Sequence, residues 1–213
     1  NGDGTKTSHY REDYQAYTSA LSVAMTDYVT WTDTYVSPLD GTTMPLEYYA
    51  FPEDAAKAMV DYDVTGDAIV YFAQIYGEYP FINEKYGIAE TPNRMGSLEH
   101  QTMTTIGGFN YDLVTHELGH MWFGDMITCR DWHHGWLNEG FATYAEALWA
   151  EESGGLSAYR EYMKYMEFWD GGTVYLQDTS DPFRIFIGII YRKGAYFLHM
   201  LRGVLGDETF FKC

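Results

Sequence analysis

Two histidines and a glutamate lie close together in the segment VTHELGHMWFGD, residues 114–125. Residues four positions apart on an α-helix lie one turn apart on the same face, so His116 and His120 can direct two imidazole nitrogens at one metal ion. Glu117 lies about 100° further round the helix, where its carboxylate can reach a reacting water molecule without binding the metal. The spacing therefore indicates a metal centre with its own general base.

The same pattern also arises by chance, as two hydrogen-bonded core histidines beside a surface glutamate. The rest of the segment is apolar nearly all round, with Leu113, Val114, Leu118, Met121, Trp122 and Phe123. Burying three titratable groups in such a helix costs free energy unless the groups have partners or a function. The motif alone leaves both interpretations open, and a third ligand has to separate them.

Glu139 is the candidate for that third ligand. It follows His120 after eighteen intervening residues, near the start of another amphipathic segment. Catalytic zinc sites use three protein ligands and keep a fourth position open. Glu139, Thr143 and Glu146 form a polar stripe that would otherwise be a solvated helix face. The combination predicts one Zn²⁺ ion held by His116, His120 and Glu139.

These motifs resemble those of the gluzincin metallopeptidases, and specifically the aminopeptidase N family. HELGH followed after eighteen residues by Glu139 in WLNEGFATY carries the resemblance, and YPFINEKYGIAE, EHQTMTTIG and YRKGA occur in the family's order and spacing. The resemblance implies an α+β, thermolysin-like metallopeptidase domain with a small mixed β-sheet plus helices. It further implies a zinc-dependent aminopeptidase that hydrolyses the N-terminal bond of peptides with a free N-terminus.

The resemblance also implies a substrate-binding segment. The family's GxMEN pattern matches GSLEH here, so Gly96 and Glu99 are expected to bind the substrate, Glu99 through the free α-amine. Such an amine has a pKa of about 7.7–8.0 and is mostly cationic at neutral pH, so a carboxylate near the metal selects a chain terminus. Leu98 replaces the family's Met, a volume-conserving change. His100 replaces its Asn, whose substrate contact is therefore not carried over.

Further catalytic roles are expected, the first from the same resemblance and the others from the positions of the residues. Tyr191, in IIYRKGAYF, matches the tyrosine with which the family stabilises an oxyanion. Glu117 is expected to act as general base and then general acid. Asn138 is expected to position the substrate or the glutamate ligand, and Glu146 and Asp125 to orient the histidines.

Three other functions remain open from the sequence: a zinc endopeptidase, an epoxide-hydrolase-like relative, and a non-catalytic fragment that keeps the fold for binding. An endopeptidase has no need of Glu99, because its substrates present no free amine at the site. The presence of Glu117 and Tyr191 argues against a module that only binds.

The composition limits the partners. Acidic residues number 31 against 13 basic residues, for a formal net charge of −18. This balance disfavours nucleic acids and anionic membranes and favours cationic or amine-bearing ligands. No run of 18 apolar residues is present, so no membrane segment is predicted. The first residues do not read as a signal peptide, and the compartment is left unassigned.

Periodicity places these motifs on elements of an α+β protein. Two strands are predicted within residues 14–36, and others at 44–51, 86–91 and 100–107. Helices are predicted at 52–63, 65–79 (with Thr65 as N-cap), 111–124, 136–151, 156–168 and 189–204. We expect residues 1–37 to end an N-terminal β domain, and residues 38–213 to form the catalytic domain, truncated before a C-terminal helical domain.

Overall fold

The computed structural model describes residues 2–5, 7–9, 11–17, 21–92, 96–108 and 110–212. The strands are β1 (Val29–Val36), β2 (Thr43–Ala50), β3 (Tyr86–Glu90) and β4 (Thr104–Ile106). The helices are α1 (Ala55–Asp61), α2 (Val64–Tyr76), α3 (Tyr111–Gly119), α4 (Trp136–Tyr165), α5 (Gly194–Leu205) and α6 (Asp207–Phe210). Short π-helical turns at Met121–Met126 and Ile189–Lys193, and 3₁₀ turns at Trp132–His134 and Pro182–Arg184, complete the elements.

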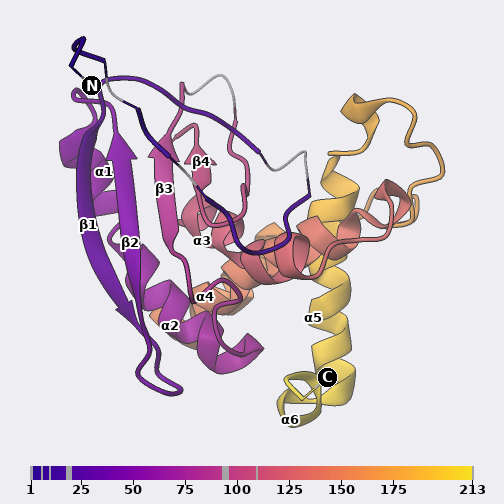
Figure 1. Ribbon diagram of the computed structural model, residues 1–213. Helices are drawn as coiled ribbons and strands as arrows, with labels where there is room; N and C mark the ends of the chain where they lie inside the picture. The colour runs from indigo at the N-terminus through magenta and orange to yellow at the C-terminus, as the bar shows by residue number, and fades with distance from the viewer. Residues whose placement is uncertain are drawn as a thin grey trace.

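The four strands form one mixed sheet in the order β1-β2-β3-β4 (Figure 1). β1 and β2 are antiparallel, with Val29 opposite Ala50, while β2, β3 and β4 run parallel. The predicted α+β fold with a small mixed sheet is confirmed. The predicted domain boundary after residue 37 falls between β1 and β2, within this sheet, and the division into domains stays a prediction.

The prediction of two strands within residues 14–36 is wrong for the first of them. Among the described residues of this range, only Val29–Val36 form a strand; residues 18–20 lie outside the description. A strand needs a neighbour for its backbone hydrogen bonds, whatever its side-chain pattern. Instead, Tyr14 packs edge-on against Phe81, with ring centroids 5.3 Å apart.

The predicted helices form, with four differences. The helix predicted at 189–204 begins as a π-helical turn, Ile189–Lys193, and is α-helical from Gly194. Thr65 lies inside α2 rather than capping it, and its hydroxyl donates to the Tyr62 carbonyl at 2.6 Å. The helix predicted at 111–124 ends at Gly119 and passes into a π-helical turn. The helices predicted at 136–151 and 156–168 form the single element α4, with one non-helical residue at Gly155.

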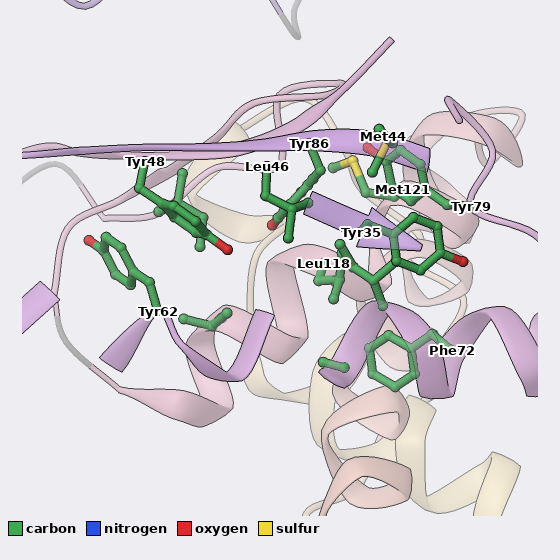
Figure 2. Packing of buried hydrophobic residues seen from close by; sticks show 14 of the residues in the cluster. Tyr35, Met44, Leu46, Tyr48, Tyr62, Phe72, Tyr79, Tyr86, Leu118 and Met121 are labelled. Carbon is green, nitrogen blue, oxygen red and sulfur yellow. The ribbon is translucent and has the colours of Figure 1, made fainter. Parts of the chain in front are cut away.

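The main core lies between the sheet and the helices that cover it. Leu46 and Tyr86 from the strands, Phe72 from α2 and Leu118 from α3 gather there, all fully buried (Figure 2). Burying each such side chain contributes about 1.5–3 kcal/mol. The core therefore fixes α3 against the sheet with its apolar face inward.

Helix α4 contacts α3, and α5 packs in turn on α4 (Figure 1). Helix α3 therefore has two packed neighbours, the core beneath the sheet and α4. This leaves its histidines facing α4, which carries the predicted third ligand. Within the described part of the chain, none of the helices combines the length and apolar composition needed to cross a bilayer.

Candidate metal centre and catalytic site

Helix α3 begins with a side-chain cap and ends at the predicted metal ligands. Asn110 has extended backbone angles, and its side chain accepts a hydrogen bond from the Asp112 N–H at 3.0 Å, a standard N-cap. His116 lies within the helix, and His120 immediately follows its last residue. The His120 N–H still donates to the His116 carbonyl at 3.2 Å, so both imidazoles lie on one face.

The three predicted ligands converge. The two imidazole Nε2 atoms lie 3.1 Å apart. Glu139 Oε2 lies 3.3 Å from His116 Nε2 and 3.1 Å from His120 Nε2. Ligands bound at 2.0–2.1 Å around a tetrahedral ion are separated by roughly 3.3 Å. The three atoms therefore have the spacing and the chemistry of a metal site.

The other nitrogen of each imidazole has its own partner. His116 Nδ1 lies 2.7 Å from Glu146 Oε1, and Tyr162 donates its hydroxyl to Glu146 Oε2 at 2.6 Å. His120 Nδ1 lies 3.0 Å from the Phe123 carbonyl oxygen. Because Nδ1 donates to these acceptors, the lone pair of each neutral imidazole is on Nε2 and points at the metal position. Glu146 thus makes the contact that its predicted orienting role requires.

The Phe123 carbonyl reaches His120 because the chain kinks there. Gly124 has φ +151°, and a Cβ atom at this position would lie 3.0 Å from His120 Nδ1. A larger residue would therefore disturb both the backbone and the imidazole. The glycine of WFGD positions the second histidine.

Burial and neighbouring charges shift the pKa values of Glu139 and His120 in opposite directions. Burial raises the pKa of Glu139, but the charge of His120 and hydrogen bonds from both histidines outweigh it, and the pKa falls to about 2. Burial lowers the pKa of His120, but the charges of Glu139 and Glu99 and the hydrogen bond to Glu139 together outweigh it, and the pKa rises to about 9. Glu139 is therefore a permanent carboxylate that attracts positive charge to this position.

Two more carboxylates border the group. One oxygen each from Glu99 and Glu117, together with a nitrogen of His120, lie within 4.8 Å of one another. Glu117 is 5% exposed, and its burial raises its pKa to about 7, although the charges of both histidines act against this rise. A carboxyl with this pKa can accept and return a proton near neutral pH, as a general base must.

Tyr191 covers the site from the turn before α5. Its ring stacks on His116, with ring centroids 5.9 Å apart. Burial, with the charges of Glu139 and Glu99, raises the pKa of its hydroxyl, which therefore stays protonated and can donate. A close approach of α4 and α5 brings it here, because a Cβ atom on Gly140 would lie 2.9 Å from Gly194 Cα.

Three predicted residues have other surroundings. Asn138 is buried, and its side-chain oxygen accepts from the Cys129 N–H at 3.1 Å, so it fastens the loop before α4. Asp125 contacts neither imidazole in the described structure. The Phe123 carbonyl oxygen, and not Asp125, is the partner of His120 Nδ1. Gly96 lies exposed with φ +74°, just before Leu98, which bridges to Thr105 of β4.

Some contacts have no obvious signal in the sequence. The Tyr162 hydroxyl on Glu146 comes from sixteen residues further along α4, and this chain has 20 tyrosines. The Gly140–Gly194 contact does have a signal, since each glycine directly follows a motif residue in NEG and RKG.

The chain is similar in sequence to known metallopeptidases. Residues 96–213 match the peptidase family M1 domain. Aminopeptidase N of Streptomyces lividans is 31% identical over 204 residues, which cover 81% of this chain and 24% of that protein. The chain belongs to peptidase family M1.

Solved structures agree with membership of family M1. The M1 zinc metallopeptidase of Deinococcus radiodurans superposes with a TM-score of 0.71 at 30% identity, covering 86% of this chain and 42% of that one. A mutant of the Deinococcus radiodurans enzyme bound to a Tyr-Ser-Ala substrate gives 0.67 at 28% identity, with the same coverage. This family M1 chain spans about a quarter of the length of the curated relatives it matches.

The buried carboxyl of Asp125 should make the free energy of unfolding of this chain depend on pH. The residue is 7% exposed, and neither carboxylate oxygen has a hydrogen-bond partner among the described residues. Burial, followed by the charge of Glu99, raises the pKa of Asp125 to about 8. Between about pH 4 and pH 8 the folded chain holds a proton that the unfolded chain has released, so stability falls as pH rises.

We expect Asp125→Asn to flatten this dependence. In metal-free protein, the free energy of unfolding of the wild type should fall from pH 5 to pH 8 more steeply than that of the variant. The difference in slope is at most about 1.4 kcal/mol per pH unit. Urea unfolding of both proteins at several pH values measures it, and parallel curves would show that the carboxyl ionises freely in the fold.

Proposed function

We propose that this chain carries the catalytic site of a zinc-dependent aminopeptidase, which hydrolyses the N-terminal peptide bond of peptides with a free N-terminus. One observation carries the proposal: three ligand atoms converge beside two further carboxylates, those of Glu117 and Glu99. His116, His120 and Glu139 would hold the ion. Bound Zn²⁺ would act as a Lewis acid and lower the pKa of a coordinated water.

The carboxylate of Glu117 moves the proton. It accepts a proton from the attacking water on one oxygen and returns it to the nitrogen of the leaving amine as the peptide bond breaks. Its near-complete burial supports this role, because burial raises the pKa of the carboxyl and so makes the carboxylate a stronger base. The Tyr191 hydroxyl donates to the carbonyl oxygen as negative charge develops there.

The carboxylate of Glu99 selects the N-terminus of the peptide substrate. An α-ammonium group donates to it, which places the first peptide bond, and no later one, beside Glu117. The segment 96–99 lies along the outer edge of β4, with paired backbone bonds of 2.9 Å between Leu98 and Thr105. An extended peptide can continue this edge. The acidic composition, with a net charge of −18, also favours amine-bearing substrates over nucleic acids.

Replacing the tyrosine tests the oxyanion role. We expect Tyr191→Phe to lower kcat by about 10²–10³-fold with little change in KM, because the lost hydrogen bond acts mainly in the transition state. Steady-state kinetics on an aminoacyl amide measure both constants. A large rise in KM with unchanged kcat would instead make Tyr191 a substrate-binding residue.

Metal dependence tests the proposal as a whole. The full natural chain should release N-terminal residues one at a time, lose this activity to a chelator and regain it with about one equivalent of zinc. Mass spectrometry of the products identifies the bond that is cleaved. Internal cleavage, or activity that survives complete metal removal, would contradict the proposal.

A further inference from the structure

The site extends well beyond the metal ligands, in a cavity of about 830 Å³. Helix α3 gives this cavity an axis, because Asp112, His116 and His120 follow one another at intervals of four residues and all line it. At 1.5 Å per residue, Asp112 lies about 12 Å along the helix from His120. The cavity thus has an end near His120 and a distal end near Asp112.

The proposed amine anchor lies at the His120 end. A carboxylate oxygen of Glu99 lies within 4.8 Å of ligand atoms of both His120 and Glu117. His116 does not belong to this group. A peptide held there by its N-terminus runs past the metal position towards the distal end. Extended chain advances about 3.3 Å per residue, so its second and third residues approach Asp112.

The distal end is acidic. Asp112 and Glu161 line it from α3 and α4, and the charge of Asp112 acts on the nearby Tyr162. Glu146 also lines the cavity, but its two oxygens contact His116 and Tyr162. Apart from the two histidines, the one basic residue lining the cavity in the described structure is Arg192, whose Nη2 donates to the backbone carbonyls of residues 165 and 167 at 2.6 and 2.8 Å.

A buried hydroxyl on the α4 wall of the cavity has no hydrogen-bond partner among the described residues. Thr143 lines the cavity between Glu139 and Glu146 on α4 and is 3% exposed. Its Oγ1 has no hydrogen-bond partner in the described part of the chain. Buried hydroxyls are normally hydrogen-bonded, so this enclosed oxygen leaves unmet hydrogen-bonding capacity just behind the cavity wall. The wall is therefore suited to a ligand that carries hydrogen-bonding groups.

We propose that this distal wall selects peptides with lysine or arginine as the second or third residue, with Asp112 and Glu161 attracting the cationic side chain. The inference rests on the proposed aminopeptidase function, because Glu99 sets the direction of the peptide. Both carboxylates are partly open to solvent, so the attraction is screened by salt.

Matched peptides test the inference on the full natural chain. In two series, either the second or the third residue is lysine, alanine or glutamate, with the other residues kept as alanine, and kcat/KM is measured for release of the first alanine. We expect the lysine peptide to exceed the glutamate peptide by roughly tenfold at low salt, falling towards twofold at high salt. The double variant Asp112→Asn/Glu161→Gln should reduce the low-salt ratio to below about threefold.

Control variants separate a loss of charge selection from a loss of stability. Glu152→Gln removes an exposed carboxylate of α4 outside the cavity and should leave the ratio unchanged. Asp112 lies in the first turn of α3, where its charge also stabilises the helix, so thermal unfolding of each variant is compared. Glu161→Gln alone, outside that turn, should lower the ratio by roughly twofold.

Two results would overturn the inference. If the alanine peptide is cleaved but the lysine-to-glutamate ratio is near one, or stays the same in the double variant, the distal wall does not select charge and the proposed function stands. If no peptide loses its first residue, the proposed function fails, and the inference that rests on it fails too.

Discussion

Replacing Glu117 by Gln should lower kcat/KM for every peptide substrate by about 10²–10⁴-fold, the largest effect expected of any single change. The amide of glutamine keeps the size of the side chain but cannot accept the proton of the attacking water. Glu117 is also 5% exposed and lies beside His120 and the carboxylate of Glu99, which the proposed function assigns to the substrate amine. Steady-state assays of the wild type and the variant measure the loss.

The control for this variant is its metal content. His116, His120 and Glu139 are unchanged, so Glu117→Gln should retain about one equivalent of zinc when measured by mass spectrometry of metals. Glu152→Gln, an exposed change on α4, should match the wild type in activity. A Glu117→Gln protein that holds zinc and keeps a tenth or more of its activity would assign the general base to another group.

Replacing Glu99 by Ala should also have a large effect, but only on substrates with a free amine. Removing one partner of a desolvated charge pair costs about 2–5 kcal/mol, so kcat/KM for a free peptide should fall by about 30-fold or more. N-acetylated peptides have no ammonium group and should lose little from their already low rate. The preference for free over blocked peptides should therefore shrink.

Glu99→Gln separates charge from shape. It keeps hydrogen-bond acceptance but removes the negative charge, so an intermediate loss is expected. If both variants cleave free peptides as fast as the wild type, Glu99 is not the amine anchor. The site would then be that of an endopeptidase, which needs no carboxylate at this place.

Much of the site could be predicted from local patterns in the sequence. His116, Glu117 and His120 fall within five residues of one helix, so their mutual placement follows from helix geometry alone. Glu139 is distant in the chain, and its recognition depended on a motif at a fixed offset. The structure brings its carboxylate within 3.3 Å of both imidazoles.

Contacts that depend on tertiary packing were less predictable. The π-helical turn after His120 places the Phe123 carbonyl on Nδ1 of His120, whereas the sequence offered Asp125 as a candidate for orienting the histidines. Residues 21–28 have the composition of a strand, yet in the described structure they pair with none, because β propensity needs a partner edge. Thr65 shows the same limit, since a threonine near a helix start caps it only if the chain turns at that residue.

The most direct test of the central claim compares two peptides that differ by one acetyl group. The full natural chain, loaded with zinc, is assayed on a peptide with a free N-terminus and on its N-acetylated counterpart. We predict a kcat/KM ratio above about 100, because only the free amine is a cation that Glu99 can bind. Equal cleavage of both peptides would contradict the assignment of this site to an aminopeptidase.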